Sequence, residues 1–306
     1  MPSSTSNRCR STTPSSLSWE GRPLQQVLQS GAALLQAAGV ESPRRTMELL
    51  LCHVLGCSRA WLYGHDDTSL PAPAARQLQR LLRRCLRREP LQYVLGEVDF
   101  CGLRLRVRPG VFIPRPETEL LVEEAVRILR QLPVPNPAVL DLGTGSGAIA
   151  VAIAAHHPGA RVLGVDISAR ALRCARSNAR ALGIRRVRFR PLDILRQLPQ
   201  GRFHMVVSNP PYIPAARLPQ LQPEVREYEP AEALTDFADG LSFYRRYAHI
   251  LPQVLLPGGV FLLELGDGLA SAAVDILRST GARLSVRRDY AGTERILIGW
   301  MPDSPR

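Results

Sequence analysis

The sequence predicts an α/β protein in which a doubly wound sheet follows a small helical bundle and a β-hairpin linker. Apolar residues recur at helical spacing across residues 24–88, where Gly and Pro separate the segments. Residues 103–108 instead alternate apolar and charged side chains, as a strand with one buried face does. From residue 138 onward, strand-length apolar runs alternate with helical segments, which is the order of elements in a parallel sheet covered by helices.

The composition is that of a globular protein. The chain has 306 residues and 45% hydrophobic content, and none of its apolar runs reaches the roughly 18 residues of a spanning helix. Residues 1–21 are rich in Ser, Thr and Pro and lack the apolar core of a secretion signal, so we expect a disordered extension or a start assigned too early. We therefore predict a cytoplasmic monomer with no membrane association.

Cysteine usage indicates free thiols rather than disulfides or a metal site. Six cysteines show no paired short spacing, as in proteins of a reducing compartment. The one group with metal-binding residue types is Cys52-His53, Cys57 and His65. Because the adjacent Cys52 and His53 project from different faces of a helix, we expect buried helix cysteines and no metal.

The net charge of +12 does not by itself name a partner. All 39 basic residues are arginine and none is lysine, which suggests GC-rich coding more than recognition. The arginines gather within residues 76–108 and 170–190. Long-range electrostatic attraction of an acidic partner is therefore an open alternative, but we expect no surface that reads nucleic-acid bases.

The helical bundle is predicted to occupy residues 22–89. Its expected helices cover residues 24–38, residues 43–55, a short segment capped by Ser58, and a segment around residues 78–86. Pro43 suits a first helical turn, and Gly56 suits a helix end. The last helix carries an arginine face, for which solvent exposure is the more common explanation.

Residues 90–111 are predicted to form the β-hairpin linker, and the catalytic domain is predicted to cover residues 112–301. In the segment Phe112-Ile113-Pro114-Arg115-Pro116-Glu117-Thr118-Glu119, Pro114 and Pro116 favour an extended backbone. Thr118 is expected to cap a helix that continues to Leu132. We interpret this segment as an entrance loop flanked by Phe112.

The expected sheet of this domain follows directly from the alternation of elements. Its predicted strands are residues 138–142, 161–165, 187–191, 203–208, 259–264 and 295–299. Its predicted helices are residues 148–156, a segment through 171–179, residues 244–255 and residues 269–280.

A glycine-rich turn follows the first of these strands. The turn Gly143-Thr144-Gly145-Ser146-Gly147, with Asp166 near the end of the next strand, is typical of an adenosine-binding site. A dinucleotide and S-adenosyl-L-methionine both fit this pattern. Asp141, just before the turn, favours S-adenosylmethionine, because a carboxylate repels a pyrophosphate and attracts an ammonium. We expect Asp166 at the ribose and Asp193 near the adenine amine.

The stretch Asn209-Pro210-Pro211-Tyr212 follows the strand at residues 203–208 and suggests the chemistry. Two prolines stop strand pairing and stiffen the loop. The Asn209 Oδ1 atom and the Pro210 carbonyl can together accept both hydrogens of a planar NH2 group, with Tyr212 as one wall. Oriented acceptors of this kind suit transfer to an amide or exocyclic amine, with no strong base required.

These residues resemble a Rossmann-like class I methyltransferase, and further motifs make the resemblance specific. They are Pro90-Leu91-Gln92-Tyr93, Gly96-Glu97, residues 112–119, residues 209–212, residues 224–230, Asp239-Gly240-Leu241 and residues 288–292. From residue 24 to residue 300 the chain resembles the peptide chain release factor glutamine methyltransferases (HemK/PrmC family).

The resemblance implies a function and a set of site residues. It implies that the helical domain helps to dock a release factor and that the second domain methylates the glutamine of its Gly-Gly-Gln loop. The residues implied at the cofactor are Gly143 to Gly147, Asp166, Asp193, Ile194 and Asn209. Those implied at the substrate are Asn209, Pro210, Pro211, Tyr212, Phe112, Arg115 and Glu117. Ile194 departs from relatives that carry an aromatic beside the adenine, so weaker packing is expected there.

Two other functions remain as alternatives. A methyltransferase of exocyclic amines in nucleic acids shares the glycine turn and the Asn-Pro-Pro-Tyr loop, and it suits the positive charge, but no segment resembles a target-recognition domain. A catalytically idle binding protein would tolerate loss of Asn209 or of the glycines, and both are present.

Overall fold

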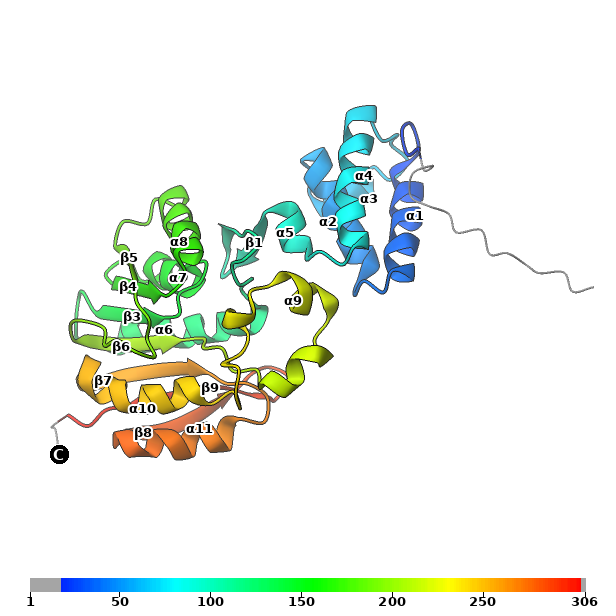
Figure 1. Cartoon of the computed structure of the whole chain (residues 1–306). Helices are drawn as coiled ribbons and strands as arrows, with labels where there is room; N and C mark the ends of the chain where they lie inside the picture. The colour runs from blue at the N-terminus through cyan, green and yellow to red at the C-terminus, as the bar shows by residue number, and fades with distance from the viewer. Residues whose placement is uncertain (1–17, 304–306) are drawn as a thin grey trace, which may run out of the picture. The chain divides into compact units, whose positions relative to one another are not determined.

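A computed structural model describes residues 18–303 of the chain. Contacts along the chain divide it into two compact units, of which the first ends at Leu95 and the second begins at Gly96 (Figure 1). The second unit holds the predicted glycine turn and the Asn-Pro-Pro-Tyr loop.

Helices form the first unit. Within residues 18–95 they are α1 (Leu24–Ala37), α2 (Pro43–Leu55), α3 (Arg59–Gly64), α4 (Ala72–Leu86) and α5 (Leu91–Leu95). The predicted helix ends are present. Gly56 follows α2 with φ of 65°, and the Ser58 hydroxyl caps α3 by accepting from the Trp61 backbone N–H at 3.1 Å. The four predicted helices are confirmed, and α5 occupies residues that were predicted to begin the hairpin linker.

The start of the first unit differs from the expected extension at residues 1–21. Residues 1–17 lie outside the described residues, but residues 18–21 are part of the helical unit. Trp19 is 1% exposed in the core of the unit, and the Gly21 N–H donates to the Leu70 carbonyl at 2.9 Å. Burial of a large aromatic side chain contributes about 1.5–3 kcal/mol, which explains why these residues are ordered despite their polar surroundings in sequence.

A short hairpin opens the second unit. β1 (Glu97–Phe100) and β2 (Leu103–Arg106) pair in antiparallel register around Cys101 and Gly102, whose φ angles are 49° and 72°. This two-residue turn with positive φ matches the twist of the strands. The predicted alternation from residue 103 is confirmed, while the hairpin itself is shorter than the expected residues 90–111. The Asn178 side chain holds the hairpin to helix α8 (Ala169–Ala181) by accepting from the Arg106 N–H at 2.9 Å and donating to the Arg106 carbonyl at 3.0 Å.

Seven strands form the main sheet of the second unit. They are β3 (Ala138–Leu142), β4 (Arg161–Asp166), β5 (Val187–Pro191), β6 (Phe203–Ser208), β7 (Leu255–Glu264), β8 (Arg283–Arg288) and β9 (Glu294–Trp300). Their spatial order is β5-β4-β3-β6-β7-β9-β8, and β9 runs antiparallel to both neighbours. The chain builds outward from β3 to β5 and then returns to place β6 on the other side of β3. This reversal between β3 and β6 is the position where open α/β sheets bind ligands.

Helices cover both faces of this sheet (Figure 1). One face packs on α6 (Glu119–Gln131), α7 (Ala148–His156) and α8 (Ala169–Ala181), and the other packs on α10 (Ser242–Val254) and α11 (Ala270–Leu277). Successive strand residues alternate between the two cores: Val139 belongs to the first and Leu140 to the second. The predicted doubly wound sheet is confirmed.

Shorter helices complete the second unit. They are the α-helix α9 (Pro223–Tyr228) and the 3-10 helices η2 (Pro116–Thr118), η3 (Ala215–Gln220), η4 (Ala231–Ala233) and η5 (Arg278–Thr280). Among residues 18–303, no helix has the length and hydrophobicity to cross a membrane, the five cysteines form no disulfide, and no three His, Cys, Asp or Glu side chains are grouped as metal ligands.

Candidate active site

A cavity of about 270 Å³ lies at the carboxyl ends of the central strands. The predicted site residues that line it are Phe112, Gly143, Thr144, Gly145, Ser146, Asp166, Asp193, Ile194, Asn209 and Pro211. The predicted residues outside its lining are Asp141, Gly147, Pro210, Tyr212, Arg115 and Glu117. The cavity therefore brings the glycine turn, the two acidic strand ends and Asn209 around one space.

The glycine turn is fastened to the end of β4 by Asp166. The Gly145 N–H donates to Asp166 Oδ2 at 2.8 Å, and the Ser168 N–H donates to Oδ1 at 2.8 Å. Gly145 has φ of 56°, a left-handed conformation that favours glycine. Burial raises the pKa of Asp166, and the backbone donors counter this rise. Asp166 thus shapes the turn as well as facing the cavity.

Close helix packing explains the last glycine of the turn. Gly147 immediately precedes α7 with φ of 81°, and a Cβ atom there would lie 2.9 Å from the Cβ of Ala175 on α8. Such a contact requires backbone movement, so a larger residue would displace the helix from the turn. Gly147 consequently supports the site without lining the cavity.

Asp141 is buried and does not reach the cavity. Its side chain is 0% exposed, and Oδ2 accepts from the Thr144 hydroxyl at 2.5 Å, while Oδ1 has no hydrogen-bond partner among residues 18–303. Burial, with a further contribution from Asp166, raises its pKa to about 7. Asp141 was expected to attract a ligand ammonium directly, whereas its carboxyl lies behind the glycine turn and is bonded to Thr144, a residue of the cavity lining.

Asp193 and Ile194 follow β5 at another side of the cavity. Asp193 Oδ1 accepts from the Leu195 N–H at 3.1 Å, and Ile194 is 8% exposed in the lining. The Ile194 carbonyl accepts from the Arg246 Nε–H at 2.7 Å, which fixes this loop to α10. This loop therefore presents the apolar side chain of Ile194 to the cavity next to the Asp193 carboxylate, which can accept a hydrogen bond.

The Asn-Pro-Pro-Tyr loop leaves the sheet at β6, and its first residue is oriented by Thr118. The Asn209 Nδ2 group donates to Thr118 Oγ1 at 3.1 Å, so Oδ1 is the amide atom left to accept from a ligand. Within residues 18–303, no donor reaches the Pro210 carbonyl. The Tyr212 hydroxyl donates to Glu264 Oε1 at 3.1 Å.

Thr118 has a different role from the predicted helix cap. Its side chain makes no capping hydrogen bond to α6, and it lies 3% exposed in the cavity lining with Asn209 as its partner. The expectation of a cap is wrong because the 3-10 turn η2 already precedes α6 and turns the hydroxyl toward the loop.

The entrance segment is held by a buried acid. Glu229 accepts from the Ile113 N–H at 3.1 Å and forms an ion pair with Arg115, whose guanidinium stacks 5.0 Å from the centre of the Phe112 ring. Arg115 is therefore engaged within the protein, and Glu117 is exposed outside the lining. Of the three residues in this segment that the resemblance implied at the substrate, Phe112 lines the cavity and Arg115 and Glu117 do not.

Sequence reasoning missed an aromatic residue at the mouth of the cavity. Phe237 lines the cavity, is 64% exposed and has φ of 58°. Asp236 holds the loop by accepting from the Ala238 and Gly240 N–H groups at 2.9 Å, and Thr235 Oγ1 accepts from the Phe237 N–H at 3.0 Å. A left-handed backbone is costly for phenylalanine, and such strain occurs often at functional sites, so Phe237 is a candidate for contact with a ligand at the mouth of the cavity. The signal in the sequence was an isolated aromatic within the polar turn Thr-Asp-Phe-Ala-Asp-Gly.

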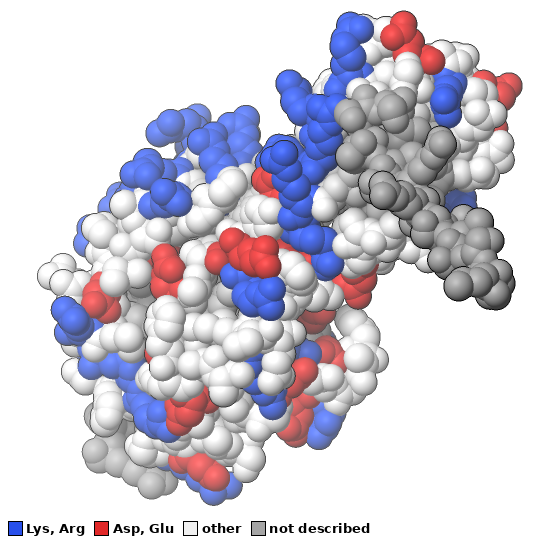
Figure 2. All heavy atoms as spheres, turned by 45° about the vertical axis from the view of Figure 1, so that its right-hand side comes forward, with Lys and Arg blue, Asp and Glu red and all other residues white. Residues whose placement is uncertain are grey.

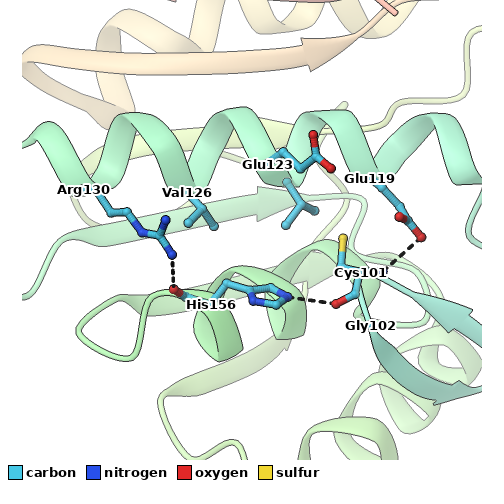
Figure 3. A pocket seen from close by; sticks show the side chains of 8 residues that line it. Cys101, Gly102, Glu119, Glu123, Val126, Arg130 and His156 are labelled. Atoms are coloured by element: carbon cyan, nitrogen blue, oxygen red, sulfur yellow. Dashed lines mark hydrogen bonds between the residues drawn. The ribbon is translucent and has the colours of Figure 1, made fainter. Parts of the chain in front are cut away.

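A second cavity, of about 430 Å³, lies between the hairpin and the helices α6 and α7 (Figure 3). It contains the Cys101 thiol, whose pKa is raised to about 12 by burial and by Glu119 and Glu123. The His156 ring nitrogen Nε2 lies 2.9 Å from the Cys101 carbonyl. With a protonated thiol and an imidazole paired to backbone, this cavity offers no activated nucleophile.

Comparisons with known proteins agree with the geometry. Residues 26–96 match the PrmC N-terminal domain, and residues 103–219 match the methyltransferase small domain. The release factor glutamine methyltransferase of Geobacter sulfurreducens is 43% identical over 277 residues, which cover 90% of this chain and 96% of that protein. The enzyme of the same name from Bordetella pertussis is 47% identical over 262 residues, covering 85% and 95%.

A solved structure supports the fold. A methyltransferase from Pyrococcus furiosus superposes with a TM-score of 0.50 at 18% identity, over 66% of this chain and 90% of that one. The release factor glutamine methyltransferases compared with this chain are 40% to 47% identical to it over 84% to 96% of their own length. The chain therefore belongs to the family of release factor glutamine methyltransferases.

Proposed function

We propose that this protein transfers a methyl group from S-adenosylmethionine to the side-chain amide nitrogen of the glutamine in the Gly-Gly-Gln motif of peptide chain release factors, and that it does so in the cytoplasm. The observation that carries the proposal is the position of Asn209. Its side chain lines the same cavity as the glycine turn and Asp166, and its Nδ2 group is already bonded to Thr118. Asn209 Oδ1 is then a fixed acceptor for a substrate NH2 group beside the cofactor.

The residues around the cavity fit S-adenosylmethionine. Where a Cβ atom of Gly143 would stand there is no atom within 4 Å, so a ligand can approach the backbone closely. Asp141 does not reach this space, but it fixes the hydroxyl of Thr144, which lines the cavity within the glycine turn. Asp166 would hold the ribose hydroxyls, and Asp193 with Ile194 would hold the adenine. When bound, the cofactor supplies an electrophilic methyl group on a sulfonium.

The chain's own residues overcome the low nucleophilicity of an amide. The amide nitrogen delocalises its lone pair, so it must be held in line with the methyl group. Asn209 Oδ1 and the Pro210 carbonyl accept the two amide hydrogens and fix that direction. The same acceptors stabilise the positive charge that grows on the nitrogen during transfer, after which the proton leaves to water. Pro211 and Tyr212 keep the loop rigid.

The helical unit is proposed to dock the release factor. Without residues 22–89, we expect KM for an intact release factor to rise, while turnover of a short Gly-Gly-Gln peptide and affinity for the cofactor stay near those of the full chain. Steady-state kinetics on both substrates make the comparison, with calorimetric cofactor binding as the check on folding. Unchanged kinetics on the intact release factor would remove the docking role.

Phe237 is proposed to contact the substrate protein at the mouth of the cavity. Phe237→Gly should raise KM for the release factor roughly tenfold, the equivalent of about 1.4 kcal/mol, because the aromatic contact is lost. Thermal stability should hold, since glycine removes a left-handed strain of about 1–2 kcal/mol. Tyr290→Gly is the matched control, an aromatic that is 93% exposed outside the cavity lining. An unchanged KM in Phe237→Gly would exclude this contact.

Transfer to nucleic acid is the alternative that the charge suggests. Exposed arginines such as Arg173, Arg176 and Arg180 on α8 form a positive surface, and Figure 2 shows basic side chains gathered in patches on the side of the molecule that it draws. Radiolabelled methyl groups should pass to a purified release factor and leave duplex DNA and ribosomal RNA unlabelled. Labelling of RNA or DNA without labelling of the release factor would replace the proposal by the alternative.

A further inference from the structure

A buried carboxylate that the proposed chemistry does not use joins two walls of the active-site cavity. One wall comes from residues within 110–118, and the other comes from residues within 230–237. Glu229 stands immediately before the second wall, at the end of α9, and its side chain is 1% exposed. Its two oxygens reach the first wall at Ile113 and Arg115, which lie 116 and 114 residues earlier in the sequence.

The first contact holds the backbone of the entrance segment. The Ile113 N–H donates to Glu229 Oε2 at 3.1 Å, and Ile113 itself is 1% exposed. Water therefore does not replace this acceptor, and a buried N–H group without a partner is unfavourable. Because Phe112 and Pro114 both line the cavity, Glu229 fixes the backbone between two residues of the wall.

The second contact continues to the ring that lines the cavity. Glu229 Oε1 accepts from the Arg115 guanidinium, whose central carbon lies 5.0 Å from the centre of the Phe112 ring. A cation over the face of an aromatic ring is attracted to it. Phe112 lines the cavity, whereas Arg115 and Glu229 do not. The guanidinium thus supports the ring from outside the lining, and the carboxylate supports the guanidinium.

Stability alone is a weak explanation for this arrangement. Removal of a carboxylate from water is unfavourable, and well-packed apolar residues often replace a buried ion pair with no loss of stability. Apolar residues cannot, however, accept from the Ile113 N–H or present a flat cation to the Phe112 ring. The contacts of Glu229 therefore fix a geometry, and that geometry belongs to the cavity wall.

The turns proposed to bind the cofactor are held by other contacts. The glycine turn is fastened to β4 through Asp166, and the loop that carries Ile194 is fastened through Arg246. These hydrogen bonds are separate from those of Glu229. Loss of Glu229 should therefore disturb the wall that carries Phe112 and leave the cofactor-binding turns in place.

We propose that Glu229 is a positioning residue of the glutamine site, which acts through Arg115 to keep the Phe112 ring in the wall that faces the substrate side chain. The inference rests on the proposed function of the cavity. Without the carboxylate, the guanidinium can leave the ring for solvent, because the Arg115 side chain is already 29% exposed. Phe112 then turns away, and the substrate amide loses one side of the slot that aligns it.

The test uses the full chain and measures kcat/KM for an intact release factor, together with calorimetric Kd for the cofactor. Glu229→Gln keeps an acceptor for the Ile113 N–H but loses the charge that holds Arg115. We expect kcat/KM to fall about tenfold and the cofactor Kd to stay within about twofold of the wild type. Arg115→Met leaves Glu229 in place, removes the guanidinium, and should give the same loss.

Glu124→Gln is the matched control for loss of a buried carboxylate. Glu124 lies on α6 outside the cavity lining, its side chain is 5% exposed, and it forms ion pairs with Arg127 and Arg287. Both substitutions leave arginines without their buried partner, so both should lower thermal stability. The control should keep the wild-type kcat/KM, because its carboxylate supports no residue of the cavity.

Coupling to Phe112 distinguishes positioning from a general weakening of the fold. Phe112→Ala removes the ring that Glu229 is proposed to hold, so loss of Glu229 should have little further effect. We expect Glu229→Gln to lower kcat/KM by less than about twofold in the Phe112→Ala background, against about tenfold in the wild type. A role in stability alone would give the same loss in both backgrounds.

The outcomes separate this inference from the function on which it rests. A wild type that leaves the release factor unmethylated overturns the proposed function and the inference together. An active wild type overturns the inference alone if Glu229→Gln retains its kcat/KM, if Glu124→Gln loses as much, or if the loss persists in the Phe112→Ala background. If Glu229→Gln fails to fold, Arg115→Met decides by the same comparison with and without Phe112.

Discussion

Asn209→Ala should lower kcat for release factor methylation by on the order of 10²–10³, the loss that follows removal of one preorganised polar group in an active site. The variant loses the acceptor Oδ1 that faces the cavity and also releases Thr118, the partner of its Nδ2 group. The substrate amide then keeps one acceptor, the Pro210 carbonyl, and rotates about it. Single-turnover rates at saturating cofactor measure the effect without interference from product release.

Two companion variants sharpen this prediction. Asn209→Asp keeps the shape and one acceptor oxygen but replaces the donor to Thr118 by a second acceptor, so it should stay well below the wild-type rate. Asn136→Ala removes an exposed asparagine whose Oδ1 accepts from Arg186 at 2.6 Å, and it should leave the rate unchanged. If Asn209→Ala keeps kcat within threefold of the wild type, the acceptor role of Asn209 is wrong.

Asp166→Ala should weaken S-adenosylmethionine binding by roughly 1–3 kcal/mol, as loss of hydrogen bonds to a charged group does. Its carboxylate would accept from the ribose hydroxyls, and it already holds the N–H groups of Gly145 and Ser168 at 2.8 Å. The variant therefore loses a ligand contact and loosens the glycine turn. Isothermal calorimetry with the cofactor and with its demethylated product gives the affinity.

A matched aspartate separates this effect from general loss of charge. Asp99, on the hairpin, has a side chain that is 83% exposed, and Asp99→Ala should bind the cofactor as the wild type does. Asp166→Asn, which keeps one acceptor oxygen, should fall between the two. Wild-type affinity in Asp166→Ala, or tight binding of a nicotinamide dinucleotide by the wild type, would contradict the placement of the cofactor.

The elements of the fold were predictable where their signals are local. Proline and glycine mark the ends of α2, and strands buried on both faces, such as β3 and β6, appear as continuous apolar runs. β8 was missed because it is an edge strand whose sequence Arg-Leu-Ser-Val-Arg-Arg holds two apolar residues among three arginines, which is not a strand-length apolar run. Trp19 was missed because a single aromatic in a polar segment shows its burial through contacts with distant residues.

The same distinction applies to the candidate site. The glycine turn and the Asn-Pro-Pro-Tyr loop are contiguous, so their residue types and order were sufficient to predict them. Thr118 and Glu264 were missed because their partners are 91 and 52 residues away, at Asn209 and Tyr212. Asp141 was expected at the ligand, but its carboxylate lies inward with Thr144, a direction that spacing along the chain does not specify.

The methyl group is expected to arrive on the side-chain nitrogen of one glutamine of the release factor. A purified release factor should be incubated with the enzyme and S-adenosylmethionine, digested, and mapped by tandem mass spectrometry, next to a release factor whose Gly-Gly-Gln glutamine is replaced by alanine. We expect a mass increase of one CH2 unit that is confined to that glutamine and absent from the substituted factor. Methylation at another residue, or equal methylation of the substituted factor, would contradict it.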